Sequence, residues 1–257
     1  MDHHSRLREI LLAFQEGSIS IDDAEEAVEG LRIEHLHGVA RLDLDRDVRC
    51  GIPEVVLAEG KGEHHLARIL ERQVTAAGRC IATRITPAQV EAVSAVLGDG
   101  VAIDHREEAG ILILSTGPAP KPTGGRVGVL SGGTADIRAA EEAAVIAEEM
   151  GCRVSRAYDV GVAGIHRLFP ALKEMRDAHV LVVAAGREGT LPAVVAGLVD
   201  RPVVGLPVSV GYGFMGEGEA ALASMLQACT VLAVVNIDAG FVAGAYAARI
   251  AHMVAGR

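Results

Sequence analysis

Glu188 is the residue whose position in the sequence most suggests chemistry. It lies in the turn 186–189, between the apolar segment 181–185 and a small-residue segment that begins near Thr190 and Pro192. The apolar segment is typical of a strand buried in a parallel sheet, and the second segment is typical of a helix. Open α/β sheets bind ligands at such turns, beside free backbone N–H groups. Taken alone, the pattern is better explained by a solvated glutamate between two glycine residues needed for the turn.

A second glycine-rich turn, Ser-Gly-Gly-Thr at 131–134, follows the apolar segment 126–130 and enters a predicted helix. Its backbone N–H groups and hydroxyls can wrap a phosphate. The turn lacks the Lys of a P-loop and the G-x-G-x-x-G spacing of a dinucleotide fold. A helix cap without a ligand is therefore the alternative interpretation.

Two further predicted strand ends carry polar and glycine residues. The first supplies Tyr158, Asp159, Gly161, His166 and Arg167, and the other supplies Ser209, Gly211, Tyr212 and Gly213. The second segment, GYGFMGEGE, is too long and too rich in glycine for a turn alone, and it predicts a mobile lid.

The cysteine residues give little guidance by themselves. All four are widely spaced without a C-x-x-C motif, which indicates neither a zinc site nor a disulfide framework. By composition alone Cys229 is an inert core residue rather than a nucleophile. Cys50 and Lys61, each beside a glycine, are candidates for a reactive thiol and an anion contact, with a buried structural Cys and a surface Lys as alternatives. The adjacent His pairs cannot share a helix face, so no metal ligands are predicted there.

The elements that carry these residues fall into a regular order. After the linker TGPAPKPTGG at 116–125, five predicted strands alternate with helices over 126–257. This alternation predicts a three-layer, doubly wound parallel sheet. A smaller α/β domain is predicted over 38–115, with an edge strand or hairpin at 40–49. A helical hairpin is predicted over 1–37, with Ser20 and Asp23 starting its second helix.

Composition narrows the class of protein. Half of the 257 residues are hydrophobic but only 3% are aromatic, so the core must be built from Ala, Val, Leu and Ile. The formal net charge of −10 argues against nucleic acid or an anionic membrane as a partner. No convincing membrane span or signal peptide is recognised, which favours a reducing, cytoplasmic setting.

From Arg126 onward the chain resembles the phosphoribosyl-aminoimidazole carboxylases of purine synthesis. The similar features are the Ser/Gly turn followed by Asp136, the His166-Arg167 pair, the run AAGxxGxLPxxxAG and the segment PVVGLPV. The SAHRTP element of the purine enzymes is present only in part, as GIHRLFP. The resemblance implies their fold and a homo-oligomer, an octamer built around the Ala- and Gly-rich C-terminal helices.

Nearly the whole chain also resembles the LarB family of nickel-pincer cofactor synthesis. The matching motifs are RCGIPEVVLAEGK, GRVGVLSGGTADIRAAEEAA, YDVGVAGIHRL, GREGTLPAVVAGLVDRPVVGLP, VSVGYG, the region of Cys229 and VVNIDAGF. This resemblance implies a pyridinium-3,5-biscarboxylic acid mononucleotide synthase. Such an enzyme carboxylates C5 of nicotinic acid adenine dinucleotide with CO2, and hydrolyses its phosphoanhydride to release AMP. The product feeds the cofactor of lactate racemase and related enzymes.

The resemblance also assigns roles to residues of this chain. It implies that Cys229 adds covalently to the pyridinium ring, which makes C5 electron-rich, and that Glu188 removes the C5 proton after carboxylation. The diphosphate of the substrate implies Mg2+, with Asp136 and Asp159 as candidate ligands. The substrate is expected to be held by Ser131, Gly132, Gly133, Asp136, Asp159, Gly161, His166, Arg167, Gly186, Ser209 and Gly211.

Three hypotheses about function follow. The first is the pyridinium carboxylase and hydrolase. The second is an aminoimidazole ribonucleotide carboxylase or mutase, which needs no thiol and whose activity would survive the loss of Cys229. The third is a non-catalytic nucleotide-binding or scaffold protein, which would bind a ligand tightly without forming a product.

Overall fold

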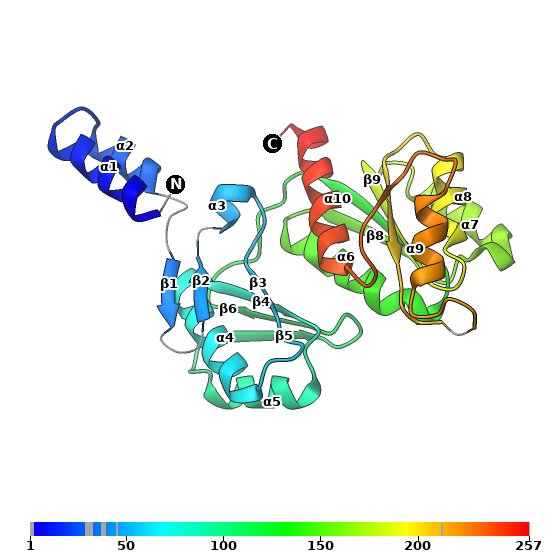
Figure 1. Cartoon of the computed structure of the whole chain (residues 1–257), viewed down its shortest axis with the longest axis horizontal. Coiled ribbons are helices and arrows are strands. Elements are labelled where there is room, and N and C mark those ends of the chain that lie inside the picture. The colour runs from blue at the N-terminus through cyan, green and yellow to red at the C-terminus, as the bar shows by residue number, and fades with distance from the viewer. Residues whose placement is uncertain (1–2, 29–32, 37–39, 45, 212, 257) are drawn as a thin grey trace. The chain divides into compact units, whose positions relative to one another are not determined.

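The computed structural model describes residues 3–28, 33–36, 40–44, 46–211 and 213–256. The chain forms two compact units, 1–105 with 112–117, and 106–111 with 118–257 (Figure 1). The predicted domain limits, at 37/38 and on either side of 116–125, stay predictions. Within the described ranges, no helix has the length and apolar character needed to cross a membrane.

The chain begins with two helices, α1 (His3–Gln15) and α2 (Ile21–Val28). Gly17 adopts a φ of 72° between them, a backbone conformation that favours glycine. The start of α2 is capped as its sequence predicts, because the Asp23 backbone N–H donates to the Ser20 hydroxyl (3.1 Å) and the Ser20 N–H donates to the Asp23 carboxylate (2.9 Å).

The segment 40–49 differs in part from its predicted strand or hairpin. β2 (Ala40–Asp43) pairs antiparallel with the upstream strand β1 (Ile33–Leu36), which falls inside the range predicted as a helical hairpin. The second half of the segment is the short helix α3 (Arg46–Cys50), so the strand prediction is wrong there. An ion pair between Asp43 and Arg49 links the end of β2 to this helix.

The first unit also contains a four-stranded sheet of order β3-β4-β6-β5. Its elements are β3 (Val55–Leu57), α4 (Glu63–Ala77), β4 (Arg79–Thr83), α5 (Pro87–Val96), β5 (Ala102–Arg106) and β6 (Ile111–Ser115). β3 and β4 run parallel. Leu66, Leu70 and Val74 of α4 belong to a buried cluster that also contains Leu112 and Leu114 of β6. The smaller α/β domain predicted from the sequence is therefore confirmed as a fold.

The second unit is built on a five-stranded sheet of order β11-β10-β9-β7-β8, all of whose paired strands are parallel. Its elements are β7 (Arg126–Ser131), η1 (Thr134–Asp136), α6 (Ile137–Glu149), β8 (Arg153–Ala157), η2 (Val162–Arg167), α7 (Leu168–Glu174), β9 (Val180–Ala185), α8 (Thr190–Leu198), β10 (Val203–Pro207), α9 (Glu219–Leu226), β11 (Ala233–Val234) and α10 (Gly240–Ala255). This confirms the doubly wound sheet predicted for the C-terminal half.

Helices cover both faces of this sheet, which makes three layers. α6 and α10 pack side by side on one face (Figure 1). The other face carries α7, α8 and α9, whose side chains form a buried cluster with Leu181 and Val183 of β9. All residues of β9 and β10 are buried. Aliphatic side chains fill this core, as the scarcity of aromatic residues predicts.

The contact between α6 and α10 depends on glycine. A Cβ atom added at Gly244 would lie 2.3 Å from the backbone carbonyl oxygen of Ala143, and one at Gly240 would lie 2.7 Å from that of Ala139. The two helices therefore approach so closely that no side chain fits between their backbones.

Replacing Gly244 by Ala is expected to lower the free energy of unfolding by about 1–3 kcal/mol, because the helices must separate to admit the methyl group. Gly197 is the matched control, since it is also helical and its Cβ would lie an ordinary 3.5 Å from the Thr230 methyl group. Gly197→Ala should be neutral or stabilising by up to about 1 kcal/mol. Urea unfolding of both variants measures the difference, and equal effects would contradict the packing argument.

Candidate active site

The strand order places a crevice between β7 and β9. The chain leaves β7 through α6 on one face and leaves β9 through α8 on the other, so the two loops diverge at the carboxyl edge of the sheet. In open α/β sheets this switch point is where ligands bind. The two turns that the sequence singled out, 131–134 and 186–189, follow these two neighbouring strands.

Asp136 joins the two turns. Its Oδ2 accepts a hydrogen bond from the Gly133 backbone N–H (2.8 Å), and its Oδ1 accepts one from the Gly186 backbone N–H (2.9 Å). The side chain is only 6% exposed. Burial raises the pKa of Asp136, the charge of Glu188 adds to the rise, and the two backbone hydrogen bonds oppose it. Asp136 thus holds the Glu188 turn against the Ser131 turn.

Asp136→Asn should loosen this connection. The asparagine amide would turn its NH2 group toward one of the two backbone N–H donors, so we expect a loss of about 1–3 kcal/mol of stability. Amide hydrogen exchange at Gly133 or Gly186 should accelerate, whereas Asp177→Asn, at an exposed carboxylate, should leave both amides unchanged. Exchange at wild-type rates in both amides would contradict the role.

The raised pKa of Asp136 also predicts the pH dependence of stability. A carboxyl group whose folded-state pKa lies above its ordinary value of about 3.9 stabilises the fold below that value, and this contribution is lost as the pH rises through the folded-state pKa. Asp136→Asn should therefore remove part of the decline in stability with rising pH in the acidic range.

Ser131 has a structural role in this chain. It is fully buried, and its hydroxyl donates to the Gly133 carbonyl (3.1 Å) and accepts from the Asp159 backbone N–H (3.1 Å). It therefore ties the turn after β7 to the loop after β8. The prediction that Ser131 binds a ligand stays a prediction, and its hydroxyl already has two partners within the protein.

Glycine is required where the loops touch. A Cβ at Gly161 would lie 2.4 Å from the carbonyl oxygen of Gly132, and one at Gly186 would lie 2.5 Å from that of Val210. The loops after β8 and β10 therefore pack directly on the two central turns. The sequence identified Gly132, Gly161 and Gly186 as candidates for ligand binding, and the structure gives them this packing role as well.

A charged pair lies on the flank of the crevice. Asp159 forms an ion pair with Arg167, and His166 is exposed beside it on η2. Asp159 has a φ of 57°, unusual for a residue other than glycine. Arg167 and His166 are thus exposed near the turn after β7, where the sequence predicts contacts with the substrate.

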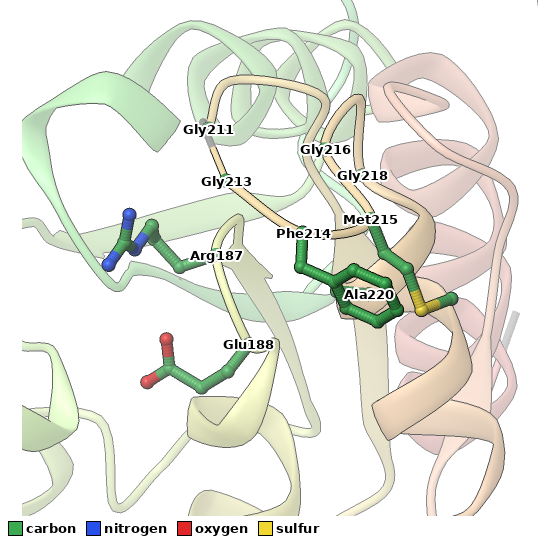
Figure 2. A pocket seen from close by; sticks show the side chains of 9 residues that line it. All are labelled: Arg187, Glu188, Gly211, Gly213, Phe214, Met215, Gly216, Gly218 and Ala220. Atoms are coloured by element: carbon green, nitrogen blue, oxygen red, sulfur yellow. The ribbon is translucent and has the colours of Figure 1, made fainter.

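A pocket of about 350 Å3 opens beside Glu188. It is lined by Arg187, Glu188, several residues of the loop 211–218 and Ala220 at the start of α9. Figure 2 shows the side chains of Arg187 and Glu188 extending to one side, and those of Phe214 and Met215 extending to the other. The site thus combines a carboxylate, a guanidinium group and an apolar wall.

Sequence reasoning missed two residues of this edge. Arg187 lines the pocket and has a φ of 44°, and strained residues of this kind cluster at functional sites. Asp238 follows β11, and its Oδ1 accepts a hydrogen bond from the Ser209 backbone N–H (2.9 Å), which fixes the loop after β10. Both residues follow a predicted strand, as the polar residues chosen from the sequence do. This position in the sequence could have identified them. The mobility of the loop around Gly211 and Gly213 stays a prediction, and Tyr212 lies outside the described residues.

Cys229 does not line this pocket. It follows the C-terminal end of α9, whereas Ala220 at the other end of this helix lines the pocket. The eight residues of α9 span about 12 Å. Cys229 is also exposed rather than buried, so its interpretation as a core residue is wrong. A single chain therefore does not bring the two residues predicted to be catalytic into one pocket.

The two candidates in the first unit are engaged within their own loops. The Lys61 Nζ donates to the Leu57 carbonyl (2.7 Å), and the half-buried Cys50 thiol donates to the Arg46 carbonyl (3.0 Å).

Comparison with known proteins agrees with this architecture. Residues 33–116 match the LarB/PurE-like N-terminal domain, and residues 126–256 match AIR carboxylase. An uncharacterised protein of Methanocaldococcus jannaschii is 40% identical over 255 residues, which cover 96% of this chain and 98% of that protein. A probable N5-carboxyaminoimidazole ribonucleotide mutase of Methanothermobacter thermautotrophicus is 33% identical over 49% of this chain and 37% of its own length.

An N5-carboxyaminoimidazole ribonucleotide mutase of Thermotoga maritima is 34% identical over 32% of this chain and 50% of its own length. These two mutases thus match only part of the chain, whereas the uncharacterised protein of Methanocaldococcus jannaschii matches nearly all of it. Two domain matches in sequence order, a five-stranded parallel sheet and the turns at its switch point all agree. The chain belongs to the AIR carboxylase family and carries the LarB/PurE-like N-terminal domain in front of its carboxylase domain.

Proposed function

We propose that this protein is a pyridinium-3,5-biscarboxylic acid mononucleotide synthase. The observation that carries the proposal is the LarB/PurE-like domain at 33–116, followed by the AIR carboxylase domain at 126–256. The enzyme would carboxylate C5 of the pyridinium ring of nicotinic acid adenine dinucleotide with CO2. It would also hydrolyse the phosphoanhydride, giving AMP and the biscarboxylated mononucleotide for nickel-pincer cofactor synthesis.

The chemistry requires a nucleophile and a base. The Cys229 thiolate adds to C4 of the cationic ring, which gives a neutral dihydropyridine whose C5 is the nucleophilic carbon of an enamine. C5 then forms a bond to CO2, and the ring nitrogen becomes an iminium cation. Glu188 takes the C5 proton, the C4–S bond breaks and the thiolate leaves, which restores the aromatic ring.

The site offers suitable groups for such a substrate. Glu188 borders a pocket whose volume of about 350 Å3 is near the lower end of the range for small-molecule sites. We assign the pyridinium and its ribose to this pocket. Arg187 beside Glu188 suits a carboxylate of the ring, and Arg167 on η2 suits a phosphate. The adenylate half of the dinucleotide would extend beyond the pocket.

The side chains in place do not form a magnesium site by themselves. No cluster of three or more His, Cys, Asp or Glu side chains able to hold a metal occurs among the described residues. Both carboxylate oxygens of Asp136 accept backbone hydrogen bonds, and Asp159 is paired with Arg167. We propose that Mg2+ enters with the diphosphate of the substrate, because this ion is commonly held by substrate phosphates with few protein ligands. No step above depends on it.

The second candidate function is an aminoimidazole ribonucleotide carboxylase or mutase. The mutases that are 33% and 34% identical to parts of this chain favour it, as does the exposed pair His166-Arg167. The departure of GIHRLFP from the SAHRTP element of the purine enzymes weighs against it, and so does the additional N-terminal domain.

Mass spectrometry of reaction products distinguishes the two functions. Purified protein is incubated with nicotinic acid adenine dinucleotide, Mg2+ and 13C-labelled bicarbonate, and in parallel with aminoimidazole ribonucleotide and its N5-carboxy derivative. AMP together with a labelled biscarboxylated mononucleotide is the expected result. Conversion of the ribonucleotides with no label in any pyridine product would establish the second function instead.

A further inference from the structure

We propose that the carboxylase domain has a second ligand site, at the amino edge of its five-stranded sheet, which takes a small phosphate ester with free hydroxyl groups, such as ribose 5-phosphate. A pocket of about 340 Å3 lies there, near the lower end of the range for small-molecule sites. Its polar side chains come from β7, from β8, and from the end of α7 with the turn that follows it. They are Arg126, Arg153, Ser155, Glu174 and Asp177.

This pocket is separate from the crevice that holds Glu188. Arg126 is the first residue of β7, whereas Ser131, which begins the turn at the crevice, is its last. Residues of a parallel strand rise about 3.3 Å each, so these two positions lie about 17 Å apart. The pocket therefore takes no part in the reaction proposed above, and the site goes beyond that function.

Two arginine residues lie opposite each other at the amino edge. Arg126 and Arg153 are partners in the parallel register of β7 and β8, so their side chains leave the same face of the sheet on strands about 4.8 Å apart. Like charges placed directly opposite each other destabilise a sheet. Two adjacent guanidinium groups are also well suited to bind one phosphate through several charge-assisted hydrogen bonds. A phosphate bound between them would remove the repulsion.

Both guanidinium groups have donors left for a ligand. Arg126 donates from its Nε to the Asp177 carbonyl oxygen (2.6 Å), which fixes the direction of the side chain and leaves its four terminal N–H groups. Arg153 is exposed, and its side chain forms no hydrogen bond or ion pair with any residue that the structure describes. The same holds, within the described ranges, for the hydroxyl of Ser155, two residues along β8 on the same face.

The acidic side chains of the pocket favour an ester over a bare anion. The Asp177 carboxylate is 78% exposed and lies 4.0 Å from the Arg176 guanidinium, so solvent and this neighbour screen its charge. Glu174 is exposed and has no side-chain partner among the described residues, and an ionised carboxylate only accepts hydrogen bonds. A sugar phosphate offers a phosphate to the arginines and hydroxyl donors to Glu174.

The wall formed by the turn after α7 is held in place by arginine side chains. Arg201 donates to the carbonyl oxygens of Arg176 (3.0 Å) and Ala178 (3.1 Å), and Arg126 donates to the carbonyl oxygen between them. Met175, only 4% exposed, adds an apolar surface to the pocket. Because this wall is formed before a ligand arrives, little ordering is needed on binding.

Calorimetric titration with ribose 5-phosphate tests the site. The titrated full-length protein carries Arg167→Gln, which removes the guanidinium assigned to a phosphate at the crevice. We expect one ligand to bind per chain. Adding Arg153→Gln should weaken this binding about 10- to 100-fold, because charge-assisted hydrogen bonds to the phosphate are lost. The free protein should keep its unfolding midpoint, since Arg153 has no partner among the described residues.

Arg249→Gln is the matched control for the loss of a positive charge. Arg249 is exposed on α10, on the opposite face of the sheet from α7, and its side chain is also unpaired within the described part of the chain. Its substitution should leave the affinity unchanged. Absence of binding, an affinity that Arg153→Gln does not alter, or an equal loss with Arg249→Gln would overturn the proposal.

Two further ligands identify the part of the molecule that is recognised. Inorganic phosphate should bind at least about 10-fold more weakly than ribose 5-phosphate, and Glu174→Ala should reduce this difference because the hydroxyl groups lose their acceptor. Equal affinity for the two ligands in the unchanged pocket would contradict recognition of an ester. Adenosine 5′-monophosphate separates the two sources of such an ester. Tighter binding than that of ribose 5-phosphate indicates a nucleotide, and weaker binding indicates a sugar phosphate.

Hydrogen exchange locates the ligand. Ribose 5-phosphate should slow exchange in the turn 175–178 and leave exchange in the turn 186–189 unchanged. Protection confined to 186–189 would place the ligand at the crevice and overturn the proposal. Carboxylation of the pyridinium substrate without binding at the amino edge would leave the proposed function standing. Binding at the amino edge without carboxylation would contradict the proposed function and leave this site standing.

Discussion

Cys229→Ala is expected to abolish carboxylation of nicotinic acid adenine dinucleotide, with a loss of at least about 1,000-fold, because without the thiolate C5 of the electron-poor ring does not react with CO2. The side chain is exposed and lies after the end of α9, so the variant should fold with an unchanged unfolding midpoint. Labelled product from 13C-bicarbonate, measured by mass spectrometry, gives the rate. Circular dichroism during thermal unfolding gives the stability.

Cys50→Ser is the matched control for the loss of a thiol. Cys50 is half-buried in the first unit, and its thiol donates a hydrogen bond to the Arg46 carbonyl. In the sequence it lies far from the carboxylase domain. It should retain wild-type turnover. Wild-type turnover by the Cys229→Ala protein would remove the covalent role and leave Cys229 as a surface residue.

Glu188→Gln should lower turnover by about 100- to 10,000-fold, the range for removal of a general base. The expected failure differs from that of Cys229→Ala. Addition of the thiolate and capture of CO2 can still occur, but the C5 proton stays in place and the thiolate cannot leave. The carboxylated substrate should therefore accumulate on Cys229, and intact-protein mass spectrometry should detect the added mass.

Glu219→Gln is the control for charge near the pocket. Glu219 begins α9 but does not line the pocket, so its substitution should leave turnover near the wild-type rate. If Glu188→Gln retains full turnover, another group accepts the proton. If it loses turnover without any adduct on Cys229, Glu188 acts before the ring is modified, and its role is to bind the substrate.

Together the two variants establish the order of the steps in the reaction. Cys229→Ala stops it before any covalent adduct forms, and Glu188→Gln stops it with the adduct in place.

The sequence by itself determined the elements of this protein and the edge at which its chemistry lies. Buried strands such as 181–185 are apolar throughout, and the turns that follow them contain glycine where the backbone must approach a neighbouring loop, as at Gly161 and Gly186. These are local properties of the chain, set by burial and backbone conformation. These properties were sufficient to predict a doubly wound sheet with Glu188 at its carboxyl edge.

Other features depend on which segments meet. Asp136 bonds to the Gly186 N–H, 50 residues away, only because β7 lies beside β9 in the sheet. The segment after β2 forms a helix although its charges alternate as in a strand, and Asp43 pairs with Arg49 of this helix.

The position of Cys229 is the plainest case. The resemblance joined Cys229 and Glu188 in one reaction, but sequence carries no distance between them. Only the tertiary structure, with α9 running away from the pocket and Thr230 fixed on α8, showed that Cys229 does not line the pocket beside Glu188. The physical reason is the fixed rise of a helix, which separates its two ends whatever residues it contains.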